Sequence, residues 1–284
     1  MNGPAAAWQS GAVNATALAE ARNADQAAAR AGVSIRDLES LHDLAGADEL
    51  FTCIWGGRNQ DAVPTNLMRA LSHSGNYVAG AFRGADLIGA SVAFAWGDAR
   101  ALHSHISGVL PDGQGRGVGY ALKLHQRAWA AARGITEITW TYDPLIRRNA
   151  WFNLVKLGAR VDGFHADFYG PMEDGINGSD PTDRCFVTWP VDSAGEPSAP
   201  PERVQMLLEE GTEGEPLIVG SPDDAPALGC RIPADAVELR VRDRGLGRAW
   251  RLALRETMGA AIQSGYAVAT ITRDGRYILE RRPG

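Results

Sequence analysis

The chain has 284 residues, of which 45% are hydrophobic and 22% charged, which is typical of a globular protein with enough apolar material for a core. Its net charge of −6 leaves no basic excess to neutralise phosphates and argues against a nucleic-acid partner. The three cysteines are far apart, with neither metal-ligand spacing nor a disulfide framework, which favours the cytoplasm, and no apolar run approaches the roughly 20 residues that span a bilayer.

The first 31 residues are rich in alanine and poor in large apolar side chains. The stretch "ATALAEARNADQAAARAG" can form a solvent-facing helix, but it offers little apolar surface with which to dock. We therefore expect residues 1–31 to be a mobile extension. This segment also lacks the basic and apolar regions of a signal peptide.

From residue 33 the hydrophobic pattern predicts an α/β domain. Strands are expected in "VSIRDL", "NYVAGAFR", "DLIGASVAFAWG" and "ALHSHISGVL", with two helices between the first and the second of them. A helix in "YALKLHQRAWAAARG", a strand in "ITEITWTYD", a short helix in "NAWFNLVKLG" and strands in "ARVDGFHADFYG" and "RCFVTWPV" follow. This order predicts a mixed, mostly antiparallel sheet flanked by helices over residues 32–191.

A second, smaller unit is expected after a linker rich in proline, serine and glycine. Residues 192–215 are predicted to hold this linker and a short helix. Over residues 216–284 we expect a β-β-α-β-β subdomain, with strands in "PLIVG" and "AVELRV", a helix in "GRAWRLALRETMGAAIQSG" and a hairpin that turns at Asp274–Gly275. The buried face of the helix is predicted from the spacing of Trp250, Leu254, Met258 and Ile262.

The run "PDGQGRGVGYALK", residues 111–123, places four glycines between a predicted strand and a predicted helix. Glycine allows left-handed backbone angles and close approach of a ligand, and a helix N-terminus offers unpaired N–H groups and a partial positive charge. The run therefore predicts a phosphate or pyrophosphate site, to which Arg116 can add a charge-assisted contact. The glycine spacing does not fit the dinucleotide fingerprint, and no Gly-Lys-Ser/Thr is present for a P-loop, which disfavours ATP or NAD as the ligand.

The run Gln114–Gly119 matches the pattern Q/R-x-x-G-x-G/A and resembles the coenzyme A pyrophosphate loop of the GNAT (GCN5-related N-acetyltransferase) superfamily. The preceding strand and the element order are also similar to that superfamily, over about residues 33–191. The resemblance implies an acyl-CoA-dependent N-acyltransferase with acetyl-CoA or another acyl-CoA, such as succinyl-CoA, as co-substrate and no metal. It implies that coenzyme A is bound by Val109, Leu110, Gln114, Gly115, Arg116, Gly117, Val118, Gly119, Tyr120 and Asn149.

The segment "TWTYDPLIRRNAWFNLVKLGA", followed by "YG", "IN" and "TDR", is similar to one branch of predicted acyltransferases in this superfamily. Some relatives of that branch acylate amino acids, so the resemblance implies a small-molecule amine as acceptor. Because superfamily members are often dimers, it is also compatible with a homodimer.

Two histidines are the candidate catalytic residues. The reaction needs a neutral amine, so a base assists it, and His103 occupies the position at which several GNAT enzymes carry a glutamate. Strict alternation along the strand places His103, His105, Ser107 and Val109 on one face, and an imidazole titrates near neutrality. The alternative is that both histidines are structural, as we expect for His125 on the apolar side of the next helix.

The position of the usual acidic tyrosine holds Leu154. This departure leaves open a GNAT-like module that binds acyl-CoA as a sensor without turning it over. The candidate substrate-binding residues follow the fifth strand or lie in the long polar connection after the sixth, where local turn chemistry is the alternative role. They are Asp143, Arg147, Arg148, Tyr169, Asn177 and Arg184.

Overall fold

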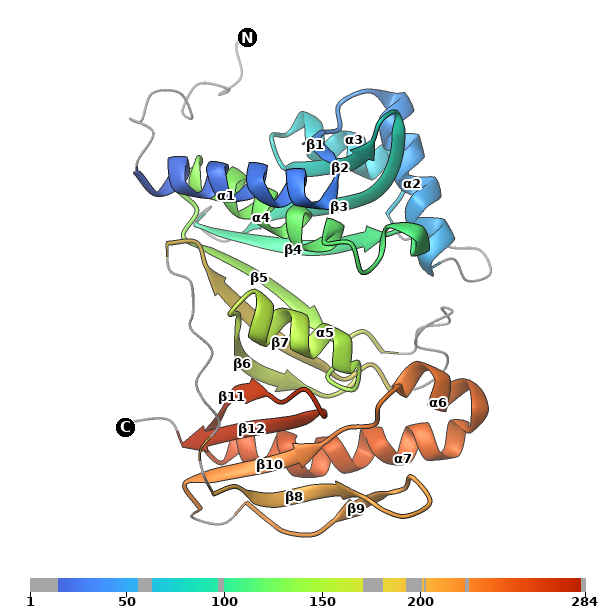
Figure 1. The fold of residues 1–284 in the computed structure, drawn as a ribbon, viewed down its shortest axis with the longest axis vertical. Helices are drawn as coiled ribbons and strands as arrows, with labels where there is room; N and C mark the ends of the chain where they lie inside the picture. Colours follow the sequence, from blue (N-terminus) through green and yellow to red (C-terminus); the bar gives the residue numbers. More distant parts are fainter. Residues whose placement is uncertain are drawn as a thin grey trace. The chain divides into compact units, whose positions relative to one another are not determined.

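The computed structural model describes residues 15–55, 63–96, 100–170, 181–192, 201, 203–222 and 225–281 (Figure 1). They belong to two compact units, one made of Met1–Thr139 with Pro190–Ser193 and the other of Trp140–Trp189 with Ala194–Gly284. The boundary falls inside a strand, whereas the sequence pattern placed it at the linker after residue 191. Residues 140–189 therefore pack with the C-terminal part of the chain.

The first unit contains a curved sheet with helices on it. In chain order its elements are α1 (Ala15–Ala31), β1 (Ser34–Asp37), α2 (Leu41–Trp55), α3 (Thr65–His73), β2 (Tyr77–Arg83), β3 (Asp86–Trp96), β4 (Ala101–Val109), α4 (Val118–Ala131) and the start of β5 (Glu137–Tyr142). The ladders β1–β2, β2–β3 and β3–β4 are antiparallel, and β4–β5 is parallel. The mixed, mostly antiparallel sheet flanked by helices is thus confirmed.

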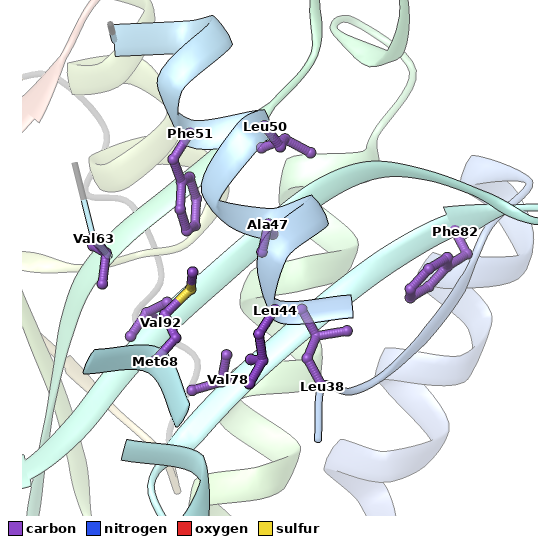
Figure 2. Close-up of a cluster of buried hydrophobic side chains, with 11 residues drawn as sticks. Leu38, Leu44, Ala47, Leu50, Phe51, Val63, Met68, Val78, Phe82 and Val92 are labelled. Atoms are coloured by element: carbon purple, nitrogen blue, oxygen red, sulfur yellow. The ribbon is translucent and has the colours of Figure 1, made fainter. Parts of the chain in front are cut away.

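One hydrophobic cluster of this unit lies between the sheet and helices α2 and α3 (Figure 2). Leu44 and Phe51 of α2 and Met68 of α3 are fully buried against Val78 of β2 and Val92 of β3. Burial of each such large side chain stabilises the fold by about 1.5–3 kcal/mol. Of the apolar residues whose helical spacing predicts these helices, Leu44, Leu50 and Met68 are buried, whereas Leu41 and Leu67 are exposed.

Helix α1 lies along α4, which corrects the expectation of a mobile extension for residues 15–31 (Figure 1). Its inward face is made of alanines, among them Ala17, Ala24 and Ala27, which are at most 9% exposed. Nε of Arg127 lies 2.6 Å from Oε2 of Glu20, and both side chains are almost fully buried. Small side chains let two helix backbones approach closely, so α1 docks without large apolar residues. Residues 1–14 lie outside the described part of the chain.

The second unit begins with the end of β5. It continues with α5 (Arg147–Trp151) and a π-helical turn (Phe152–Lys156), then β6 (Arg160–His165), β7 (Arg184–Pro190), β8 (Gln205–Glu210), β9 (Pro216–Ile218), β10 (Ala227–Arg231), α6 (Ala236–Arg242), α7 (Arg244–Leu254), a π-helical turn (Arg255–Gly259), α8 (Ala260–Gln263), β11 (Tyr266–Ile271) and β12 (Arg276–Arg281). Its five-stranded sheet has the order β11-β12-β10-β8-β9, in which only β10–β8 is parallel.

Two elements of this unit differ from the sequence prediction. The segment "AVELRV" is helix α6 and not a strand, because the Asp235 side chain accepts hydrogen bonds from the backbone N–H groups of Val237 and Glu238 and caps the helix. Residues 205–210 form strand β8, where a linker with a short helix was expected. The predicted buried face is confirmed for Trp250, Leu254 and Met258, whereas Ile262 is half-buried.

Within the part of the chain that the structure describes, no helix is both long and apolar enough to cross a membrane.

Candidate functional site

The glycine loop of the first unit joins the end of β4 to the start of α4. After a 3₁₀ turn at Pro111–Gly113, Gln114 returns to the strand, and its Nε2 donates a 3.0 Å hydrogen bond to the backbone oxygen of Val109. Gly115 and Gly117 have φ angles of 74° and 86°, in the left-handed region where other residues are strained. The sequence-predicted glycine loop therefore has two positions that require glycine for their backbone conformation.

The loop presents open backbone at the N-terminus of a 14-residue helix. Gly117 is the N-cap of α4, so no side chain caps the first N–H groups of the helix. A Cβ at Gly115 would meet no atom within 4 Å, and one at Gly117 would meet only Cβ of Ala31, at 3.8 Å. The exposed Arg116 stands between these two glycines. Unpaired N–H groups, the helix dipole and one guanidinium form an arrangement suited to an anion.

The residues predicted to bind coenzyme A on either side of the glycine loop differ in their contacts and burial. The N–H of Leu110 donates a 3.0 Å hydrogen bond to the backbone oxygen of Ile88, so it is already used inside the sheet. Val109 packs beneath the loop, since a Cβ at Gly113 would lie 2.9 Å from its Cγ1 atom. Val118 is buried at the start of α4, and Gly119 and Tyr120 are half-buried.

Strand β4 contains a bulge that changes which side chains share a face. Ser107 pairs with Ser91 and Ile106 with Val92, but Ala93 pairs with Ser104, so His105 is an extra residue in β4. Ser91 and Ala93 lie on one face of β3, which puts Ser107 on the face of Ser104. The expected single row of His103, His105, Ser107 and Val109 is therefore wrong, because the alternation restarts at His105.

Both candidate histidines nevertheless lie beside one aromatic ring. The Phe94 ring centre is 5.3 Å from that of His103 and 6.0 Å from that of His105. His103 is half-buried, and its Nδ1 lies 3.3 Å from Oγ1 of Thr139 on β5. The β4–β5 ladder ends at this His103–Thr139 pair, although β4 continues to Val109.

The surroundings of the two rings favour their neutral form. Burial lowers the pKa of His103 below its usual value, and the nearby His105 and Lys123 charges lower it further. His105 is exposed, but partial desolvation of its ring also lowers its pKa. A neutral imidazole can accept a proton at neutral pH, so either residue has the protonation state that a general base needs.

A buried polar cluster behind β4 was not predicted from the sequence. The ammonium nitrogen of Lys123 lies 3.1 Å from Oγ of Ser104 and 2.7 Å from Oε1 of Gln126, and Nε2 of Gln126 lies 3.4 Å from Oγ of Ser91. Burial lowers the pKa of Lys123 to about 7. Its signal in the sequence is the placement of Lys123 and Gln126 one helical turn apart on α4, facing the sheet.

His125 is structural, as expected. Its Nδ1 lies 3.0 Å from the hydroxyl oxygen of Tyr77, and burial lowers its pKa.

In the second unit, the carboxylate of Asp143 is buried and paired with two arginines. The residue is 6% exposed, and its carboxylate accepts hydrogen bonds from Arg251 at 3.2 and 2.7 Å and lies 3.5 Å from Nη2 of Arg240. It also accepts a hydrogen bond from the N–H of Leu145. Its charge is thus satisfied within the unit, which favours a structural role over contact with a substrate.

The polar connection after β6 holds two of the predicted substrate residues. Tyr169 is exposed, its hydroxyl lies 3.0 Å from Oγ1 of Thr141, and the Arg184 guanidinium lies 5.3 Å from its ring centre. Asp183 binds Arg255 of the same unit through two hydrogen bonds. Asn177 lies outside the described residues.

The remaining predicted residues of this unit lie on α5 and in the π-helical turn. Asn149 and Arg148 are exposed, whereas Arg147 is half-buried. Leu154, at the position of the usual acidic tyrosine, is 4% exposed and therefore packs in the core. Among the described residues there is no group of three or more His, Cys, Asp or Glu side chains that could hold a metal ion.

Comparison with known proteins found solved structures only: no family model and no curated protein matches the chain. A ribosomal-protein alanine N-acetyltransferase from Escherichia coli is 17% identical, with 59% of this chain and 99% of that chain covered and a TM-score of 0.46. The putative acetyltransferase yncA from Salmonella typhimurium, with acetyl-CoA, is 16% identical, with 60% and 99% covered and a TM-score of 0.47. A GNAT superfamily phosphinothricin acetyltransferase from Sinorhizobium meliloti, in complex with acetyl-CoA, is 17% identical, with 60% and 94% covered and a TM-score of 0.46. These three structures cover 59–60% of this chain.

Proposed function

We propose that this chain is a cytoplasmic acyl-CoA-dependent N-acyltransferase that moves an acetyl or succinyl group to a small-molecule amine. The observation that carries the proposal is the loop between β4 and α4. Its two left-handed glycines, Gly115 and Gly117, open onto the uncapped N-terminus of a long helix, with Arg116 between them. This is the arrangement that binds a pyrophosphate.

Several residues around the loop each contribute one contact to the binding of coenzyme A. The N–H groups of the first turn of α4, at Val118, Gly119 and Tyr120, face the anion, and Arg116 adds a charge-assisted hydrogen bond. Gln114 fixes the loop to the strand through Val109. With the N–H of Leu110 engaged by Ile88, the backbone N–H of Val109 is the proposed donor to the thioester oxygen. Asn149 is assigned to coenzyme A on the family resemblance alone.

The thioester supplies an activated acyl group, so a direct attack forms a C–N bond and breaks the C–S bond without an acyl-enzyme. His103, neutral at pH 7, removes the proton of the attacking amine, directly or through a water molecule. Leu154 offers no proton to the leaving thiolate, which takes one from solvent or from another group. Of the three cysteines, Cys185 and Cys230 are buried, and burial raises the pKa of both thiols to about 12. Their thiols are therefore poor nucleophiles.

The acceptor is proposed to be an amino acid or related metabolite, and the resemblance is compatible with a homodimer. A thiol-release assay tests the function: acetyl-CoA and succinyl-CoA are each incubated with a panel of amino acids, and free thiol is followed with a thiol reagent. Amine-dependent release supports the proposal. Tight binding of CoA without release for any amine would favour the acyl-CoA sensor, and the absence of CoA binding would reject both.

A further inference from the structure

The segment that carries Arg147 is held in place by the C-terminal elements of its own unit. The Tyr277 hydroxyl of β12 donates a 2.8 Å hydrogen bond to the backbone oxygen of Pro144. Arg251 of α7 and Arg240 of α6 bind the neighbouring Asp143. The backbone that precedes Arg147 is therefore fixed by three elements that follow it far along the chain.

The Arg147 side chain is half-buried. Its Nε atom is buried and makes no hydrogen bond, and Arg147 forms no ion pair within the described ranges. The nearby acids are engaged elsewhere: Asp143 pairs with Arg251 and Arg240, and Asp274 with Arg231 and Arg276. A buried guanidinium nitrogen without a hydrogen-bond partner costs free energy, which an anion bound to the same guanidinium can offset.

A glycine in the β11–β12 turn makes room for this guanidinium. Gly275 has a φ angle of 86°, and a Cβ placed on it would lie 2.7 Å from Cζ of Arg147 and closer still to Nε. The position of the guanidinium therefore depends on the absence of a side chain at residue 275. The neighbouring Arg148 is exposed.

We propose that Arg147, supported by Gly275, binds a carboxylate of a substrate. The planar guanidinium fork matches a carboxylate in geometry as well as in charge. The structure distinguishes Arg147, which lies against Gly275, from the exposed Arg148, whereas the sequence alone did not. The inference rests on the proposed function in that it assigns the carboxylate to a transferase substrate. That group belongs either to a dicarboxylic acyl donor or to an amino-acid acceptor.

Four variants of the full chain test the site. Arg147→Ala removes the guanidinium, and Gly275→Ala displaces it while leaving it present. Gly265→Ala is the matched control, because Gly265 has a similar φ of 92° but no atom within 4 Å of its Cβ position. Arg160→Ala, at an exposed position of β6, controls for the loss of a positive charge.

Each variant is titrated calorimetrically with acetyl-CoA and with succinyl-CoA, and its KM is measured for an accepted amino acid and for the corresponding amide. If the donor carries the carboxylate, Arg147→Ala weakens binding of succinyl-CoA, and not acetyl-CoA, by about 10–150-fold. If the acceptor carries it, the KM for the amino acid rises by a similar factor and that for the amide does not. Gly275→Ala should change the same affinity or KM in the same direction as Arg147→Ala, whereas the two controls should resemble the wild type.

Equal effects of Arg147→Ala on the carboxylate-bearing and carboxylate-free compounds, or no effect on any of them, would overturn the assignment. A failure of the proposed function looks different, because the wild-type chain would then neither bind acetyl-CoA nor release thiol. Circular dichroism of each variant distinguishes a lost site from a lost fold.

Discussion

Lys123 of α4 donates a 3.1 Å hydrogen bond to the Ser104 hydroxyl of β4, and both side chains are buried. Ser104 stands next to the bulge at His105, so this bond ties the helix that follows the glycine loop to the strand that carries the candidate base. The Lys123 charge also lowers the pKa of His103. A cation in the interior thus influences both the packing of the first unit and the titration of its site.

The first prediction concerns this lysine. Its pKa is about 7 in the folded chain, against about 10.4 in an unfolded one. Between these values the unfolded chain binds more protons, so the free energy of unfolding contributed by Lys123 rises with pH from about 7 to about 10. Relative to Lys123→Met, wild-type stability should rise by at most about 1.4 kcal/mol per pH unit in this window.

Denaturant unfolding at several pH values measures this difference. The Ser104 and Gln126 groups left without Lys123 add an offset that does not vary with pH, so the slope is the informative quantity. Lys156→Met is the control, because Lys156 is exposed. Parallel stability curves for the wild type and Lys123→Met would contradict the prediction.

The second prediction compares two glycines at the ends of α4. Gly117 and Gly134 have φ angles of 86° and 70°, so alanine at either position introduces comparable backbone strain. We expect both variants to lose about 1–3 kcal/mol of stability, whereas only Gly117→Ala should weaken binding of CoA, by about tenfold or more. Isothermal titration with CoA decides this, and equal affinities for the two variants would remove the loop from the site.

The third prediction concerns the base. His103→Ala should lower kcat by about 10²–10⁴-fold and leave the KM for acyl-CoA unchanged, since the loop is untouched. Because burial lowers the pKa of His103, the acidic limb of the wild-type pH–rate profile should lie below the ordinary histidine value of about 6.5. Activity of the variant should recover partly at high pH, where more of the amine is already neutral.

His105→Ala, measured alongside, tests the choice between the two imidazoles. It should keep most of the activity if His103 is the base. Near wild-type kcat in both variants would mean that no histidine of β4 takes the proton.

The fourth prediction concerns helix α1. Glu20→Ala removes the carboxylate that binds Arg127 in a buried setting and should cost about 1–3 kcal/mol of stability. Gln26→Ala, on the exposed face of the same helix, should be close to neutral. Thermal unfolding of both variants measures the difference, and equal melting temperatures would show that α1 contributes little to the first unit.

The features that could be predicted from the sequence are those that neighbouring residues determine. The glycine loop was found because left-handed angles and a helix start are properties of a few neighbouring residues. Helices α2 and α3 were found because apolar residues recur at helical spacing, among them Leu44 and Leu50 in α2 and Met68 in α3. Helix α1 was underestimated because an alanine face carries no apolar signal, although Ala24 and Ala27 are buried. The segment of α6 was predicted as a strand, but it is a helix whose N-terminus is capped by the Asp235 side chain.

The candidate site was predictable only in part for a similar reason. A bulge leaves no mark in the residue pattern, so the faces of β4 could be assigned only from the pairing of Ser104 with Ala93. The contact of Arg147 with Gly275 and the pairing of Asp143 with Arg251 join segments distant in the chain, and single-sequence patterns do not report such pairs.

The bulge at His105 lets β4 lose one residue without turning any inward side chain to the opposite face. Ser104 and Ile106, on either side of His105, pair with Ala93 and Val92, which are consecutive in β3. Deleting His105 would therefore give a regular ladder in which Ser104 still faces Lys123 and Val109 still supports the glycine loop. The strand would lose only its local bend, so the bulge shapes β4 without deciding which side chains point inward.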